Sequence, residues 1–126
     1  MTLDHVPFAK LLGIEVDASE PGRAVLSMKL RDDLMRNNGI AHGGAIATLI
    51  DSAMAIAIMA QLAENERTVT VDLTLHYLRP LAGGVAKASA KVVRAGRRVI
   101  TVSGEVFDEN EKLAVTSLST YLRITT

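Results

Sequence analysis

The sequence predicts an α+β fold in which a curved antiparallel sheet wraps around one long central helix. Two observations lead to this expectation. The segment from Ala45 to Leu62 is almost entirely apolar or small, which is typical of a helix buried on most of its sides. Segments before and after it alternate apolar with polar residues, as strands with one buried face do. The length of 126 residues suits one domain, so we expect a single domain over residues 1–126.

The part of the chain before the long helix predicts a short helix and two strands. Residues 5–13 are expected to form the short helix, which Gly13 ends. Two strands follow, joined by a turn at Glu20–Gly22, whose EPG sequence is a turn signal. The second strand should bury one face, because its apolar residues recur at every second position. These are Ala24, Leu26, Met28 and Leu30.

Four further strands are expected after the helix. Their ranges are Thr68–Leu78, Val85–Arg94, Arg98–Phe107 and Leu113–Ile124, with a tight turn at Ala95–Gly96. Several of their residues are unusually small for a sheet, which predicts that the sheet lies close against a bulky element such as the helix. The small residues are Ala86, Ala88, Ala90, Gly104 and Ala114.

Composition excludes several classes of function. The 14 basic and 14 acidic residues cancel, whereas a nucleic-acid binder normally has a basic surplus. Cysteine is absent, which removes disulfides and thiolate sites and fits a reducing cytoplasm, where we expect the protein. No secretory signal is evident at the N-terminus. The segment Ala45–Leu62 is also a poor membrane span, because it is short, rich in alanine and carries Asp51 near its centre.

Asp51 is the one carboxylate in this apolar segment, and its position needs an explanation. Burying an ionised carboxylate without partners costs several kcal/mol. A hydrogen bond to a neighbouring Ser or Thr would give Asp51 a purely structural role. The alternative is that Asp51 faces a cleft where it does chemistry.

The sequence around Asp51 resembles a known family. The stretch NNGIAHGGAIATLIDSA contains Gly-x-x-His-Gly-Gly, from Gly39 to Gly44, and an acidic residue nine positions after the histidine. This pattern resembles hotdog-fold acyl-CoA thioesterases, in particular the phenylacetate-type (PaaI-like) group. The flanking segments PFAKLLGIEV and TVTVDLTLHYLRP resemble the family as well. The resemblance implies a hotdog fold, acyl-CoA as the substrate, and a homodimer or a dimer of dimers.

One position departs from the family pattern. The family usually carries an asparagine three positions before the first glycine of the motif, where this chain has Arg36. Asn37 and Asn38 follow it directly, and of the two we favour Asn38 as the replacement. Because of this departure, the substrate of a relative is a weaker guide to the substrate of this chain.

The chemistry of thioester hydrolysis explains the motif. The start of a helix offers unpaired backbone N–H groups and a partial positive charge, and glycines let a ligand approach closely. The N–H of Gly43 or Gly44 can therefore polarise the thioester carbonyl, with Asp51 as nucleophile or general base.

The spacing of these groups predicts an oligomer. Gly43 and Asp51 are eight residues apart, or ~12 Å along a helix. One carbonyl cannot be ~3 Å from both groups of a single chain. Two antiparallel copies can bring the glycine of one chain to the aspartate of the other.

Other residues are candidates for supporting roles. Thr70 is at the position where the family tends to carry a Ser or Thr that holds the attacking water. His42 could orient Asn38 or a neighbouring loop, and we do not expect it to be the base. Arg97 and Arg98, in the AGRR turn, could meet the phosphates of CoA, although an ordinary solvated turn explains either one alone. We expect no metal, because no two histidines lie at metal-ligand spacing with a carboxylate. We also expect no bound cofactor, because CoA is part of the substrate.

Two other functions compete with hydrolysis. A non-hydrolytic acyl-CoA binding module could use the same fold, although a mere binder needs no buried carboxylate. A hydratase would require an Asp/His or Glu/His pair that the sequence does not show. The acyl group stays open between aryl and medium-chain aliphatic groups.

Overall fold

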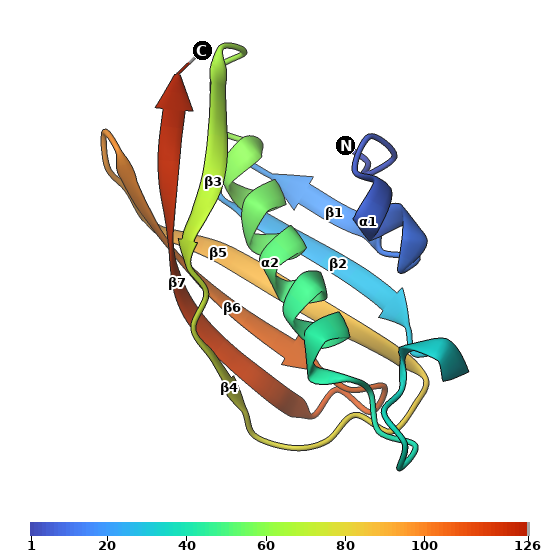
Figure 1. The fold of residues 1–126 in the computed structure, drawn as a ribbon. Coiled ribbons are helices and arrows are strands. Elements are labelled where there is room, and N and C mark those ends of the chain that lie inside the picture. Colours follow the sequence, from blue (N-terminus) through green and yellow to red (C-terminus); the bar gives the residue numbers. More distant parts are fainter. Residues whose placement is uncertain (126) are drawn as a thin grey trace.

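A curled antiparallel sheet holds one long helix against its concave face (Figure 1). This computed structural model describes residues 1–125. The helices are α1 (Pro7–Leu11), a 3-10 turn η1 (Asp32–Leu34) and α2 (Gly43–Met59). The strands are β1 (Glu15–Glu20), β2 (Arg23–Lys29), β3 (Glu66–Asp72), β4 (Leu75–Tyr77), β5 (Val85–Ala95), β6 (Val99–Phe107) and β7 (Leu113–Thr125). The predicted fold class is confirmed.

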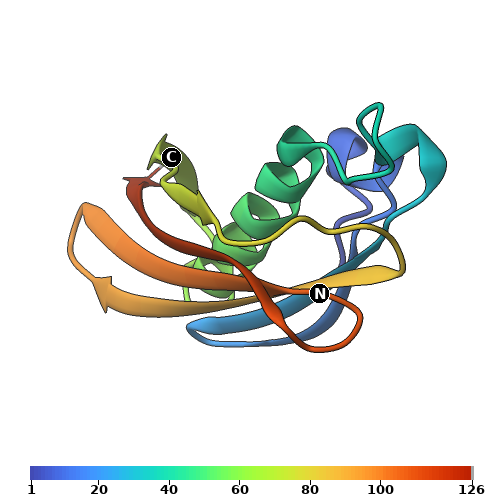
Figure 2. The same cartoon turned by 90° about the horizontal axis from the view of Figure 1, so that it is seen from below.

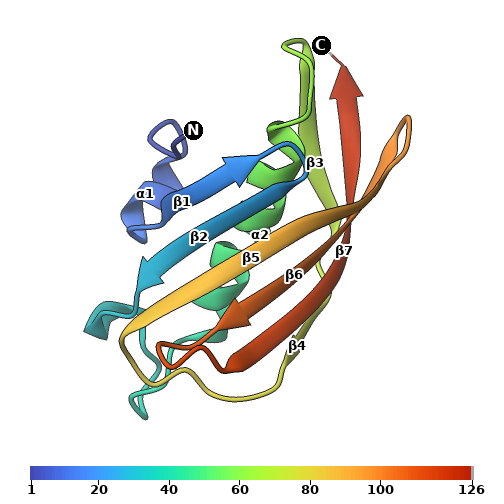
Figure 3. The ribbon, with the colours of Figure 1, turned by 180° about the vertical axis from the view of Figure 1, so that it is seen from behind.

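The order of the strands determines which elements surround α2. The sheet runs β1-β2-β5-β6-β7-β3, and β4 also pairs with β7. All of these pairs are antiparallel. Figure 2 shows the sheet curving beneath α2, while the other side of the helix has no sheet over it. From behind, in Figure 3, β2, β5 and β6 lie across the helix.

Small residues let α2 lie close to the middle of the sheet. Ala86, Ala88 and Ala90 of β5 are buried, as is Gly104 of β6. A Cβ added at Gly104 would lie 3.0 Å from two side-chain carbons of Ile50, so the helix leaves no room there for a side chain. The expectation of a sheet packed closely against a bulky element is therefore confirmed.

The helix buries most of its surface but not all of it. The residues that α2 buries against the sheet include Ile46, Leu49, Ile50, Ala53, Met54, Ile56, Ala57 and Ile58. A stripe that contains Ala47, Asp51 and Ala55 is only partly buried, with its members four residues apart and therefore on one side of the helix. We refer to these three residues as the open stripe. The helix ends at Met59, earlier than the expected Leu62, and a turn follows.

The strands before the helix agree with expectation, but one strand after it does not. The four predicted apolar residues at alternate positions are buried, three of them in β2 and the fourth, Leu30, directly after it. Strands β1 and β2 form a hairpin across Gly22, which has a φ of 82°. The single strand expected over Thr68–Leu78 is wrong, because β3 ends at Asp72 and β4 begins at Leu75. At the break, the Thr74 hydroxyl donates to Asp72 and the Thr74 N–H donates to the Ser119 hydroxyl, so side chains replace the sheet's backbone pairing.

Within the described range, no helix is both long enough and apolar enough to cross a membrane.

The packing at Gly104 gives a first prediction. We expect Gly104→Val to lower the free energy of unfolding by about 1–3 kcal/mol, because the added methyl groups must displace Ile50 and Met54. Urea denaturation measures the change. The control is Ser103→Val on the other face of the same strand, which should change stability by no more than about 0.5 kcal/mol. Equal stability of the two variants would show that the helix does not approach the sheet this closely.

Candidate active site

The carboxylate of Asp51 is held by two hydroxyl groups from the sheet. The Tyr121 hydroxyl donates to Asp51 Oδ1 over 2.6 Å, and the Thr70 hydroxyl donates to the same oxygen over 3.0 Å. Tyr121 also makes a longer contact of 3.4 Å with the backbone carbonyl of Asp51. The structure therefore brings Asp51 together with Thr70, one of the predicted site residues, and with Tyr121, which was not predicted.

The sheet register places the two hydroxyls side by side. Thr70 of β3 and Tyr121 of β7 are directly opposite each other in the antiparallel ladder. Cross-strand partners project to the same face of a sheet, and here that face is the one against α2. Tyr121 follows Ser117 and Ser119 at alternate positions of β7, and all three are buried. The inner face of this strand is therefore polar where it passes beneath the helix.

The two oxygens of Asp51 differ in their surroundings. Oδ1 accepts both hydroxyl protons, whereas Oδ2 accepts no hydrogen bond from any residue of the described chain. Asp51 belongs to the open stripe and is only partly buried. The carboxylate is thus tolerated in an apolar helix because one oxygen is hydrogen-bonded and the side chain is not sealed inside the core.

Tyr121 is the most strongly perturbed titratable group near Asp51. Burial raises the pKa of the Tyr121 phenol far above its ordinary value, and the negative charge of Asp51 raises it further, with a small opposing effect from Thr70. A phenol that resists ionisation stays a hydrogen-bond donor. Tyr121 is therefore a hydrogen-bond donor to Asp51 at neutral pH.

The start of α2 presents one free N–H group. His42 is the N-cap, and its Nδ1 accepts the N–H of Gly44 over 2.8 Å. Gly43 is the first residue of the helix, so its own N–H has no acceptor within the helix. The Tyr77 hydroxyl donates to the Gly43 carbonyl over 2.7 Å and packs beside its Cα. Of the two glycines expected as carbonyl polarisers, Gly43 is thus the one whose N–H is available.

The remaining predicted residues are not gathered around Asp51 in this chain. Asn37 and Asn38 are exposed in the loop before the helix. Arg97 and Arg98 are exposed in the turn between β5 and β6. The Arg98 carbonyl accepts the N–H of Arg123, near the end of β7. That turn lies toward the end of the molecule where α2 ends, away from Gly43 (Figure 1).

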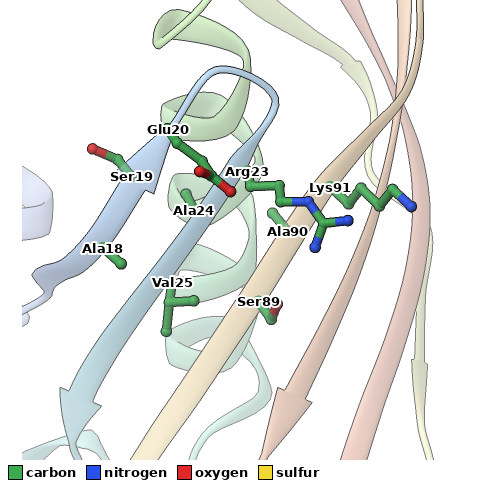
Figure 4. Close-up of a pocket in the computed structure, with 9 residues that line it drawn as sticks. All are labelled: Ala18, Ser19, Glu20, Arg23, Ala24, Val25, Ser89, Ala90 and Lys91. Carbon is green, nitrogen blue, oxygen red and sulfur yellow. The ribbon is translucent and has the colours of Figure 1, made fainter.

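Two hollows on the surface of the described chain are lined by residues other than Asp51. One, of about 360 Å³, lies over β1, β2 and β5 and is lined by Glu20, Arg23 and Lys91 together with smaller side chains (Figure 4). Another, of about 370 Å³, adjoins the start of α2 and is lined by Gly43 and Tyr77 among others. No group of three or more acidic or histidine side chains suited to a metal ion occurs within residues 1–125.

Comparison with known proteins identifies the family. The family model described as Thioesterase superfamily matches residues 38–115, which is more than half of the chain and includes Asp51 and the start of α2. The chain belongs to the thioesterase superfamily. Its curled sheet around one helix is the hotdog fold, so the resemblance found in the sequence is confirmed.

Relatives of this thioesterase include a named acyl-CoA thioesterase and proteins of solved structure. The medium/long-chain acyl-CoA thioesterase YigI of Escherichia coli (strain K12) is 28% identical, and the match covers 97% of this chain and 88% of that protein. Among solved structures, a thioesterase family protein from Silicibacter pomeroyi is 26% identical with a TM-score of 0.93, covering 98% of this chain and 93% of that one. The PaaI protein of the E. coli phenylacetic acid degradation operon is 27% identical with a TM-score of 0.87, and the match covers 94% of this chain and 84% of that one.

Two tyrosines at the site of this thioesterase were not predicted from the sequence. The chain has only two, Tyr77 and Tyr121, and each donates to α2, one at Gly43 and the other at Asp51. Alternation along β7 could have placed Tyr121 on the inner face. No local pattern could have paired it with Asp51, because that contact joins residues 70 positions apart.

The environment of Tyr121 gives a second prediction. In a Tyr77→Phe background, the single remaining tyrosine should ionise only well above about pH 10, the ordinary pKa of tyrosine. Adding Asp51→Asn should lower the pKa of Tyr121 without restoring the ordinary value, because burial is the larger cause. Tyrosinate absorbance against pH measures this, with circular dichroism reporting the fold.

The same titration has a consequence for stability. Below pH ~10 Tyr121 is neutral in both the folded and unfolded chains; above it, only the unfolded chain ionises, so stability should fall as the pH rises. Ionisation of Tyr121 near pH 10 in the folded protein would contradict the burial of its side chain and the placement of its hydroxyl beside the Asp51 carboxylate.

Proposed function

We propose that this thioesterase hydrolyses acyl-CoA, with Asp51 as nucleophile or general base and the Gly43 N–H polarising the thioester carbonyl. The observation that supports this most is the asymmetry of the Asp51 carboxylate. Two donors hold Oδ1 and none holds Oδ2, on a stripe of α2 that the sheet leaves open. A purely structural carboxylate in an apolar helix would be expected to satisfy both of its oxygens.

The proposed reaction needs only groups of the protein and water. In one form, Asp51 Oδ2 attacks the thioester carbon, the C–S bond breaks, the CoA thiolate leaves, and water then hydrolyses the acyl anhydride. In the other form, Asp51 takes a proton from a water molecule as that water attacks the same carbon, the C–S bond then breaks, and the CoA thiolate leaves and takes up the proton. Either way negative charge develops on the carbonyl oxygen, which an N–H at a helix start stabilises. Neither form requires a metal or a cofactor, and CoA enters as part of the substrate.

The proposed site is shared between two subunits. Within one chain, Gly43 and Asp51 are separated by about two turns of helix, ~12 Å along the axis. The open stripe of α2 lies near β3, the last strand of the sheet, where Val69 and Val71 are 44% and 59% exposed, and Leu73, directly after the strand, is 36% exposed. An edge strand with exposed apolar side chains is a surface that a second chain can cover. A dimer through this edge would bring a partner's α2 near the open stripe.

The proposed supporting roles follow from the same geometry. Thr70 has a single hydroxyl proton, which it gives to Asp51, so it can meet an attacking water only as an acceptor. His42 fixes the start of the helix by accepting the Gly44 N–H, and Asn38 would act from the same end, on the carbonyl side of the site. In this proposal Arg97 and Arg98 meet the CoA phosphates from the β5–β6 turn, as Arg is suited to do.

The acyl group is proposed from the relatives. YigI is named for medium- and long-chain acyl-CoA, and the PaaI structure comes from a phenylacetic acid operon. Both proteins are similarly distant from this chain, at 28% and 27% identity. Medium-chain and aryl acyl groups are therefore the two classes to test first.

The first test is free-thiol release from a panel of short, medium, long and aryl acyl-CoAs. Asp51→Asn should reduce kcat by at least about 100-fold on whichever class is preferred, because it removes the nucleophile or base. The control is Asp17→Asn, an exposed carboxylate on β1 that accepts from Ser27, and it should retain normal activity. Full turnover by Asp51→Asn would reject the mechanism. Binding of acyl-CoA by the wild type without turnover would favour the binding module.

A second test removes the proposed carbonyl donor alone. Gly43→Pro deletes one N–H at the first position of a helix, where proline is tolerated, and His42 already has the extended backbone favoured before proline, with φ −64° and ψ 133°. We expect kcat to fall by about 100- to 1000-fold. Gly43→Ala keeps the N–H, and its Cβ would make only ordinary contacts with Tyr77, so this control should remain active. Equal activity of the two variants would exclude the Gly43 N–H.

The same variants test whether the site is shared. Mixing Asp51→Asn with Gly43→Pro under conditions of subunit exchange creates dimers in which one site has both intact groups and the other has neither. Half of randomly paired dimers would be mixed, so activity should recover to about a quarter of the wild-type value. No recovery despite exchange, shown by mass spectrometry, would place both groups in one subunit.

A further inference from the structure

Tyr121 is the residue whose hydroxyl lies closest to the Asp51 carboxylate, at 2.6 Å. Its side chain is fully buried under α2, and it also reaches the Asp51 backbone carbonyl. The second donor to the same oxygen, Thr70, is on the more exposed strand β3 and lies at 3.0 Å. The shorter and more buried of the two hydrogen bonds is therefore the one from Tyr121.

We infer that Tyr121 is a positioning residue for hydrolysis, which with Thr70 fixes Asp51 Oδ1 and leaves Oδ2 as the oxygen that reacts. The inference rests on the proposed function, because it assigns the roles of the two oxygens of the proposed catalytic group. It adds a residue that has no counterpart in the motif around His42 and lies 70 positions from Asp51 in the sequence.

The geometry gives each oxygen a different capacity to react. An oxygen that accepts two hydrogen bonds has its lone pairs engaged, so it is a weaker nucleophile and a weaker base than a free one. The two bonds also prevent the carboxylate from rotating, which keeps Oδ2 pointing in one direction. A fixed direction matters because misplacement of a catalytic group by about 1 Å can cost about 100-fold in rate.

The alternative role of Tyr121 is simply to fill the core. Tyr121 is among the largest fully buried side chains, so its ring supports the fold in any case. The hydroxyl separates the two roles, because Tyr121→Phe keeps the ring and removes only the donor. Ser117→Ala is a matched control: it removes a buried hydroxyl from the same face of β7, one that contacts Ser119 and Met54 but not Asp51.

The experiment compares Tyr121→Phe, Thr70→Val, the double variant and Ser117→Ala by steady-state kinetics on the preferred acyl-CoA. Tyr121→Phe should lower kcat by about tenfold with little change in KM, since a hydrogen bond to a charged group is lost while the binding surface stays. The double variant should lose more than the product of the two single losses, because either donor alone still restrains the carboxylate. Ser117→Ala should keep its kcat.

A stability cycle keeps the inference testable if Tyr121→Phe folds poorly. The loss of stability caused by Tyr121→Phe should be much smaller in an Asp51→Asn background, where no charge needs the donor. Equal losses in the two backgrounds would overturn the inference. So would a kcat for Tyr121→Phe that matches Ser117→Ala, or a change confined to KM. If Asp51→Asn itself keeps full turnover, it is the proposed function that fails, which is a distinguishable result.

Discussion

The fit of α2 into the curled sheet is the constraint on which the rest of the structure depends. A helix that is apolar on nearly every side must be covered, and this chain covers it with the concave face of its own sheet. The cover is close because β5 and β6 carry alanine and glycine where they cross the helix, at Ala86, Ala88, Ala90 and Gly104. Larger residues there would push the helix outward and weaken the packing that defines the core.

The sheet covers α2 only in part, which explains where on the helix a charged group can be placed. A curled sheet reaches around only part of a helix, so one stripe stays partly open, and Asp51 is on it. At the edge of the stripe the sheet supplies polar groups, from β3 and from the inner face of β7. Polar residues therefore concentrate at the margin of the apolar core, where the hydroxyl groups of Thr70 and Tyr121 both find a partner in Asp51. The candidate site is a feature of this margin.

Much of the fold could be predicted because local patterns in the sequence indicate its elements. The alternation in β2 and β5, the turn at Gly22 and the composition of α2 each predict their element without reference to the others. The candidate site was predictable in part, since Asp51 and Gly43 belong to one short motif. Tyr121 was not, because its contact with Asp51 depends on how β7 pairs with β3 and passes under the helix. The break after Asp72 was also missed, since it depends on Ser119 in a distant strand.

The placement of Gly43 and Asp51 on a single helix has a consequence for how this chain can vary. The helix sets the distance and the angle between them, so substitutions within residues 44–50 leave the geometry intact as long as the helix persists. Inserting one residue there would instead move Asp51 by about 1.5 Å along the axis and turn it by about 100° around it. The carboxylate would then leave both of its hydroxyl partners and the open stripe at once. The number of residues between Gly43 and Asp51 is thus more strictly constrained than the identity of most of those residues.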